Sequence, residues 1–162
     1  MARRLLFALL VSLSPALLAS AAALPLKTAT EWARDLYTAE AERIAKGGTL
    51  VDDAFLTLFT PDIVELWRAA KANPHPNTLV GPTLNPLFGW NVLPGSDVKL
   101  LNVAVLLGTP QAPVLVIDVT VRATPRRVIL HLVEQPSDWR ISGIFYDEGE
   151  DFISFEKRLA GR

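Results

Sequence analysis

The sequence is poor in the residues that carry most protein chemistry: it has no cysteine, two histidines and one methionine among 162 residues. The absence of cysteine excludes disulfides, thiol catalysis and an acylated lipoprotein N-terminus. The sequence also contains neither a phosphate loop nor a nucleophile elbow, which argues against the common nucleotide-binding and hydrolase classes. His75 stands between two prolines with no partner at ligand spacing, so we expect no zinc site. Packing must therefore hold the fold together, and we expect no metal and no cofactor.

Residues 1–23 have the three parts of a secretory signal peptide. Arg3 and Arg4 precede an apolar run over residues 5–18, and small residues follow it. The run is too short to span a bilayer, so we expect cleavage rather than a retained membrane helix. Residues 24–162 then form a single domain of a periplasmic or secreted protein.

Charge argues against a nucleic-acid partner. The chain carries 16 basic and 17 acidic side chains, and two of the basic ones, Arg3 and Arg4, belong to the predicted signal peptide. Binding to phosphate needs a cationic face, which a mildly acidic domain does not offer. The partners that remain are an envelope protein or a small apolar ligand.

The front half of the chain predicts three helices. Thr28 and Glu31 have the spacing of a capping box, and helical periodicity continues from them to Gly47. A short helix is expected near residues 53–59, and a third one over residues 61–72 begins at a favourable first-turn proline. The face that this third helix should bury consists of Ile63, Leu66, Trp67 and Ala70.

Four strand-like runs follow between Val98 and Tyr146 at hairpin spacing. This order predicts an α+β fold in which N-terminal helices pack on an antiparallel β-meander. Apolar residues alternate along each run, on odd positions in three runs and on even positions in the third. The expected core residues are Leu101, Val103, Val105 and Leu107, then Leu115, Ile117, Val119 and Val121, then Val128, Leu130 and Leu132, and last Trp139, Ile141 and Phe145.

This change of parity suggests a strand register. If residues 123–126 form a loop, the core residues stay on one face when Asp118 lies opposite His131, and the next hairpin sets His131 opposite Ser142. The apolar pairs expected in the same register are Val121 with Val128, Val119 with Leu130, Ile117 with Leu132, and Leu132 with Ile141. A carboxylate, an imidazole and a hydroxyl in line have the order of a catalytic triad. The alternative is an ion pair between Asp118 and His131 on the polar face of the sheet.

The segment between residues 73 and 96 is rich in proline and glycine but also in apolar residues. Such a segment either wraps the core as a stiff connection or serves as a binding loop, and the candidate recognition surface runs from Pro82 to Pro94 together with the open end of the sheet. Its candidate binding residues are Leu84, Leu87, Phe88, Trp90 and Asn91.

An acidic turn and a last apolar segment complete the chain. The acidic turn consists of Asp147, Glu148, Glu150 and Asp151. Its spacing matches no known calcium loop, so we expect a solvated turn rather than a metal site. A short C-terminal helix should follow, with Phe152, Phe155 and Leu159 on one side.

Several of these segments belong together. They are residues 53–61, residues 66–70, Asn85-Pro86-Leu87-Phe88, and Trp139-Arg140-Ile141 with Ile144. With them the chain resembles the small exported bacterial proteins grouped as Domain of Unknown Function 3828. The resemblance implies a nuclear transport factor two-like fold, a cone in which helices pack into a curved antiparallel sheet. The chain departs from the family pattern at Asn85, where the family tends to have an acidic residue, and at Gly89-Trp90-Asn91, where a Gln-Asp pair is frequent.

Together these features predict an exported, non-catalytic binding or interaction module of the bacterial cell envelope. Two alternatives stay open. One is an isomerase or hydratase that uses a carboxylate such as Asp118 in the cavity of the cone. The other is a structural subunit that forms a homodimer through the outer face of the sheet. The apolar residues expected on that face are Val114, Val116, Ile129, Val133 and Ile144.

Overall fold

The computed structural model describes residues 27–48, 53–72, 85–89, 92–147 and 152–155. Several of the predicted features lie outside the described residues: the signal peptide, His75, Leu84, Trp90, Asn91, Glu148, Glu150, Asp151 and Leu159.

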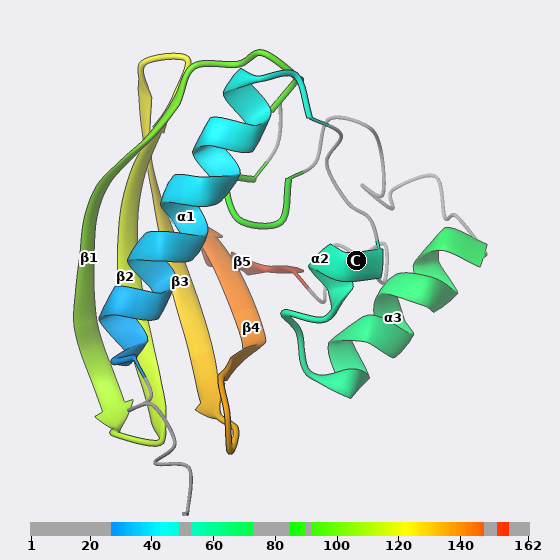
Figure 1. Cartoon of the computed structure of the whole chain (residues 1–162), viewed down its shortest axis with the longest axis vertical. Helices are drawn as coiled ribbons and strands as arrows, with labels where there is room; N and C mark the ends of the chain where they lie inside the picture. The colour runs from blue at the N-terminus through cyan, green and yellow to red at the C-terminus, as the bar shows by residue number, and fades with distance from the viewer. Residues whose placement is uncertain (1–26, 49–52, 73–84, 90–91, 148–151, 156–162) are drawn as a thin grey trace, which may run out of the picture.

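The fold is α+β, with N-terminal helices packed on an antiparallel meander (Figure 1). The helices are α1 (Ala29–Ala45), α2 (Asp53–Leu56) and α3 (Pro61–Ala72). The strands are β1 (Val98–Thr109), β2 (Ala112–Val121), β3 (Thr124–Glu134), β4 (Trp139–Asp147) and β5 (Phe152–Ser154), and they pair in that order. The sheet is neither closed nor strongly curled; α1 lies across one face, and α2 and α3 lie beyond β4.

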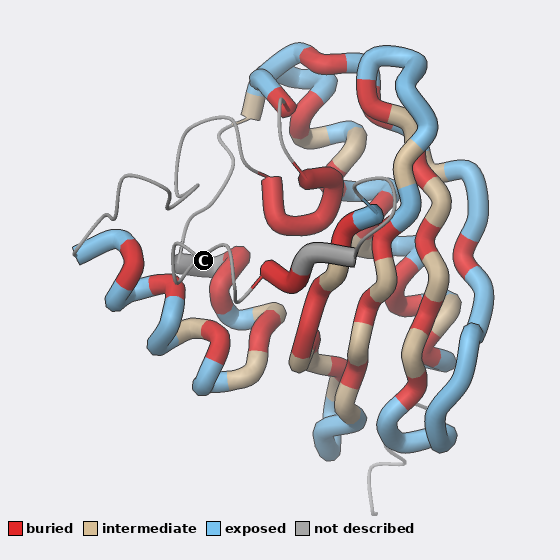
Figure 2. The backbone as a smooth tube through the Cα atoms, turned by 180° about the vertical axis from the view of Figure 1, so that it is seen from behind, coloured by how far each residue is buried: buried red, intermediate tan, exposed pale blue. Residues whose placement is uncertain are grey.

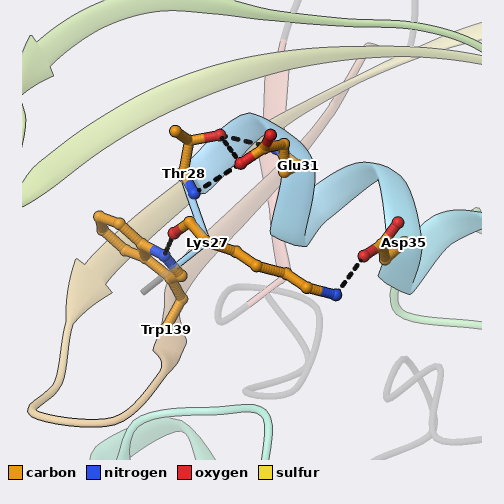
Figure 3. Close-up of polar contacts among 5 residues, drawn as sticks. All are labelled: Lys27, Thr28, Glu31, Asp35 and Trp139. Carbon is orange, nitrogen blue, oxygen red and sulfur yellow. Dashed lines mark hydrogen bonds and ion pairs between the residues drawn. The ribbon is translucent and has the colours of Figure 1, made fainter. Parts of the chain in front are cut away.

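Helix α1 is fixed at both ends, and its predicted capping box is confirmed. The Thr28 backbone N–H donates to Glu31 Oε2 at 2.9 Å, and the Glu31 N–H donates to Thr28 Oγ1 at 3.3 Å (Figure 3). Beside this cap, Trp139 Nε1 donates to the Lys27 carbonyl at 2.8 Å, which ties the helix start to β4. At the other end, the Gly95 N–H donates to the Ile44 carbonyl at 2.7 Å. The helix is therefore tied to β4 at its start and to the loop before β1 at its end.

The alternation predicted for β2 and β3 is confirmed, but their register is wrong. Val119 and Leu130 are both fully buried in the one core. The connection is a two-residue turn in which Arg122 (φ 51°) and Ala123 (φ 64°) adopt the left-handed conformation of a type I′ hairpin, in place of the expected four-residue loop. The tighter turn slides the strands by an even number of residues. An even shift keeps every core side chain on its face and changes only its partner across the sheet.

Strand β1 does not bury the residues that alternation predicts. Its register against β2 shifts between Leu100 and Asn102 and again between Val105 and Leu107. Each shift inserts a bulge, and a bulge reverses the face of the side chains beyond it. Val103 is buried, whereas the expected core residues Leu101, Val105 and Leu107 are exposed. Val105 lies opposite the buried Leu115, on the core side of the sheet, so its exposure does not come from a bulge. The strand is mostly exposed along its length at the sheet edge (Figure 2).

A third register shift changes which residues at the end of β4 face the core. His131 lies opposite Gly143, and the next pair is Leu132 with Ile141, so Ser142 is the extra residue of a bulge. The predicted pairing of Leu132 with Ile141 is confirmed. Beyond Ser142 the faces reverse. Phe145 therefore leaves the core, and Ile144, expected on the outer face, is fully buried.

The β4 side of the sheet is covered by neighbouring backbone. The Ile141 N–H donates to the Leu58 carbonyl at 2.8 Å, and the Thr60 N–H donates to the Ile141 carbonyl at 2.9 Å. Further along, β5 pairs with β4, and Phe152 lies opposite Asp147 in the ladder. The prediction that Phe152 belongs to a C-terminal helix is therefore wrong.

The ring of Phe155, after β5, packs into the helical layer. It stacks on Trp67 of α3 at 5.7 Å between ring centroids, and Phe59 lies 6.0 Å away. Ile63, Trp67 and Ala70 of α3 are buried as predicted, but Leu66 is exposed. The last described residues therefore close the core between α3 and the sheet.

Candidate functional site

The predicted row of Asp118, His131 and Ser142 does not form. Asp118 lies opposite Arg127 rather than His131, and its Oδ1 accepts a hydrogen bond from Arg127 Nε at 2.9 Å. This hydrogen bond, followed by the attraction of the carboxylate, raises the pKa of Arg127. Asp118 is thus one half of an ion pair on the surface of the sheet.

His131 and Ser142 have other surroundings. His131 lies opposite Val114 on one side and Gly143 on the other, and its ring is 4.9 Å from that of Phe145. Ser142 is half-buried in the β4 bulge. The alignment on which a triad depends is therefore wrong, because the short β2–β3 turn and the β4 bulge both change the register.

The described part of the predicted binding loop belongs to the core. Leu87 and Phe88 have no exposed surface, and the ring of Phe88 meets Tyr37 of α1 edge-on at 5.3 Å. Neither side chain faces solvent in this conformation. Of the two interpretations given to the segment, the described residues fit a connection that wraps the core.

Asn85 organises this loop through both ends of its side chain. Its Oδ1 accepts from the N–H groups of Leu87 at 2.8 Å and Phe88 at 3.2 Å. Its Nδ2 donates to the buried carboxylate of Glu40 on α1, which also accepts from Arg43. A buried carboxylate must be paired in this way. The sequence contained one sign of this pairing, which is the three-residue spacing of Glu40 and Arg43 in a helix.

A hollow of about 250 Å³ lies between this loop and the β2–β3 turn. Phe88, Gly89, Arg126 and Tyr146 are among the residues that line it. Arg126 Nη1 donates to the Phe88 carbonyl at 3.1 Å, and the Tyr146 hydroxyl donates to the Pro86 carbonyl at 2.6 Å. Gly89 has φ +81°, and a Cβ there would lie 3.3 Å from Arg126 Nη1. These donors hold the loop on the sheet.

An open groove of about 640 Å³ adjoins the hollow and shares four lining residues with it: Pro125, Arg126, Arg127 and Asp147. Asp118 and Asn102 also line the groove, and Asn102 Nδ2 donates to Asp118 Oδ2 at 3.4 Å. Two of its charged side chains, Asp118 and Arg127, thus pair with each other. Within the described ranges, no three histidine, aspartate or glutamate side chains gather closely enough to hold a metal ion.

The most distinctive surface of the described chain is the outer edge of β1. Leu101, Val105, Leu106 and Leu107 are each 54–61% exposed, and no charged residue occurs between Leu100 and Thr109. We call these four side chains the β1 apolar edge. In the described part of the chain, no further strand pairs with β1. Sequence reasoning missed this surface because strict alternation assigned three of the four residues to the core.

Comparison with known proteins found no match among family models, curated proteins or solved structures. The resemblance to Domain of Unknown Function 3828 therefore stays a prediction. In addition, no helix within the described residues is long and apolar enough to cross a membrane.

Proposed function

We propose that the chain is an exported, non-catalytic interaction module of the cell envelope, and that it binds a protein partner by strand pairing along the β1 apolar edge. The observation that carries this proposal is the exposure of Leu101, Val105, Leu106 and Leu107 on an edge strand that has no charged residue between Leu100 and Thr109. The predicted signal peptide supports export to the periplasm or the medium.

An uncharged apolar edge is an unusual surface to leave in water. A sheet edge presents unpaired N–H and C=O groups, and most proteins protect such edges with lysine, proline or a covering element. The β4 side of this sheet is covered by the Leu58–Thr60 backbone and by β5, whereas no further strand pairs with β1 in the described part of the chain, and its protection consists of two bulges and a single lysine, Lys99, near its start. An added strand would gain main-chain hydrogen bonds and bury the exposed leucines, which is the physical basis of β-augmentation.

The alternative of an isomerase or hydratase has less support. It needs an ionisable side chain in an apolar cavity. Asp118 is paired with Arg127 at the surface, and the buried Glu40 is held by Arg43 and Asn85. Glu40 lines neither the hollow nor the groove described above. We therefore assign no catalytic residue.

We also retain a nuclear transport factor two-like cone as the proposed fold relationship. It is supported by the order of helices followed by a meander and by the position of α1 across one face of the sheet (Figure 1). The open sheet means that any cone is shallow.

A photo-crosslinking experiment in intact cells tests the proposed function. Leu106 is replaced by p-benzoylphenylalanine, and the same replacement at Leu66, an exposed leucine on α3, serves as the control. We expect a covalent adduct from position 106 in the exported fraction and none from position 66. Equal adducts from both positions, or no adduct at 106, would remove the proposal, as would recovery of the protein from the cytoplasm with residues 1–23 intact.

A further inference from the structure

We infer that the partner on the β1 apolar edge is a second copy of this chain, paired antiparallel about a two-fold axis near Ala104. This inference rests on the proposed function, because it names the occupant of the same edge. It differs from the dimer expected from the sequence, which would have used the outer face of the sheet.

The first support is the self-complementary sequence of β1. Residues 101–107 read Leu-Asn-Val-Ala-Val-Leu-Leu, which is nearly the same in both directions around Ala104. A two-fold axis at Ala104 sets Val103 opposite Val105 of the second copy, within the regular stretch between the two register shifts, and Leu101 and Leu107 lie at the two ends of that stretch. Identical patches that meet in this way form an isologous interface, the commonest kind in homodimers. Apolar pairs directly across a ladder also stabilise it.

The second support is the distribution of charge. Lys99 is the only charged residue of β1, and it lies near one end, where it pairs with Asp97 at 3.2 Å. Antiparallel pairing about Ala104 places the two copies of Lys99 at opposite ends of the ladder. Parallel pairing would place them side by side and repel them. The charge therefore selects the antiparallel arrangement that the near-palindrome also selects.

The third support is area. Each of the four side chains exposes on the order of 100 Å² of apolar surface, so the edge offers about 400 Å² per copy before its backbone is counted. Specific interfaces bury about 600–1,000 Å² per partner, a range that the strand backbone and its flanking residues bring within reach. We therefore expect a reversible dimer with a Kd on the order of 1–100 μM.

The outer face of the sheet is the weaker candidate. Ile144, one of the five apolar residues expected on it, is fully buried in the core. Val114, Val116, Ile129 and Val133 are only half-exposed. The same face carries the ion pair of Asp118 and Arg127, whose burial in an interface would cost desolvation.

A single cysteine tests the inference directly, because the chain has none of its own. At a two-fold axis, Ala104 faces Ala104 of the second copy with Cα atoms about 4.5–5.5 Å apart, a separation that a disulfide can span. We expect the purified Ala104→Cys variant to form a covalent dimer under mild oxidation at micromolar concentration. The control is Ala69→Cys, at an exposed alanine of α3, which should stay monomeric.

Sedimentation of the unmodified protein and of the Leu101→Lys, Leu106→Lys double variant completes the test. We expect the unmodified protein to dimerise with rising concentration, and the variant to stay monomeric while melting as a folded protein. A monomeric unmodified protein, or equal crosslinking of Ala104→Cys and Ala69→Cys, would overturn the inference. If that result came with a photo-adduct between position 106 and another envelope protein, the proposed function would stand without the second copy. If no adduct formed either, both would fail.

Discussion

Asn85 and Glu40, which lie 45 positions apart in the sequence, are joined by a hydrogen bond in which the buried amide Nδ2 donates to the buried carboxylate. Position 85 needs a side chain that donates at one end and accepts at the other, because Asn85 Oδ1 also accepts hydrogen bonds from the N–H groups of Leu87 and Phe88. An aspartate offers only acceptors when ionised. The carboxylate of Glu40 therefore accounts for an amide, rather than an acid, at position 85.

The substitution Asn85→Asp should destabilise the protein strongly. It removes the donor and sets two carboxylates together in the core, so we expect a loss of about 2–4 kcal/mol in the free energy of unfolding. Asn102→Asp is the matched control, since it also places a carboxylate beside another one, Asp118, but at an exposed position. Urea denaturation should show a loss for the control of about 0.5 kcal/mol or less. Equal losses would mean that Glu40 does not depend on the amide.

The periodicity of apolar residues determined much of this fold, and the backbone irregularities determined the rest. Alternation correctly placed Val119 and Leu130 in the core, because side-chain direction in a strand has a period of two. The register depends on a turn formed by Arg122 and Ala123, which lack the asparagine and glycine that identify a type I′ hairpin in a sequence. Nothing in the residue pattern marked the bulge at Ser142.

The candidate site was missed for a related reason. A leucine that points into the core and one that a bulge has turned outward are the same letter in the sequence. Leu101 and Leu107 fit the alternation of a buried strand, and only the register shifts of β1 expose them. The polar row failed in the same way, because one short turn moved Asp118 from His131 to Arg127.

Loss of the hydroxyl group should have different effects on the free energy of unfolding at the two tyrosines of the chain. The Tyr37 hydroxyl is buried and has no hydrogen-bond partner among the described residues, whereas the Tyr146 hydroxyl donates to the Pro86 carbonyl at 2.6 Å. Tyr37→Phe should leave the free energy of unfolding unchanged or raise it by about 1 kcal/mol, and Tyr146→Phe should lower it by about 1–2 kcal/mol. Thermal and urea unfolding of both variants would check this contrast. A large loss in Tyr37→Phe would indicate a hidden partner for that hydroxyl.

Alkaline pH gives a second readout of Tyr37. Burial raises its pKa above the ordinary value of 10.0, so the folded state binds a proton that the unfolded state releases. The stability linked to this group is fully present below about pH 10 and is lost as the pH rises, by up to about 1.4 kcal/mol per pH unit. Tyr37→Phe should therefore show a shallower fall in stability between pH 9 and about pH 11 than the unmodified protein. If stability fell equally with pH in Tyr37→Phe and in the unmodified protein, this would contradict the buried, neutral state of the Tyr37 hydroxyl.

The N-terminal cap of α1 should be worth about 1 kcal/mol to the fold. Thr28→Ala removes the side chain that accepts the Glu31 N–H, and such losses typically cost about 1 kcal/mol. Thr38→Ala, at an exposed position within the same helix, should change stability by less than about 0.5 kcal/mol. The hydrogen bond from the Thr28 side chain, followed by that from its backbone, lowers the pKa of Glu31. The cap therefore stabilises the protein at pH values above the ordinary pKa of glutamate. The difference in the free energy of unfolding between Thr28→Ala and the unmodified protein should narrow in acid.

Gly108, in the β1–β2 hairpin, should tolerate replacement less well than Gly95, which lies before β1. Its φ is +103°, and a Cβ there would overlap the Ala112 carbonyl oxygen and crowd the Pro113 Cα at 3.0 Å, both of which are backbone atoms that cannot turn aside. Gly95 also has a positive φ, +81°, but no atom lies within 4 Å of its Cβ position. We expect Gly95→Ala to cost about 1 kcal/mol from backbone strain alone, and Gly108→Ala to cost at least about 2–3 kcal/mol.

The same pair of variants connects the hairpin to the proposed dimer. Gly108→Ala should distort the end of β1 and so weaken self-association in sedimentation experiments, whereas Gly95→Ala lies before β1 and should leave it unchanged. Amide hydrogen exchange would locate the effect, because faster exchange should be confined to the β1–β2 ladder in Gly108→Ala. If that variant kept both its stability and its dimer, the close approach of Gly108 to the Ala112 carbonyl would not constrain β1, and the geometry of the apolar edge would have to depend on the two bulges alone.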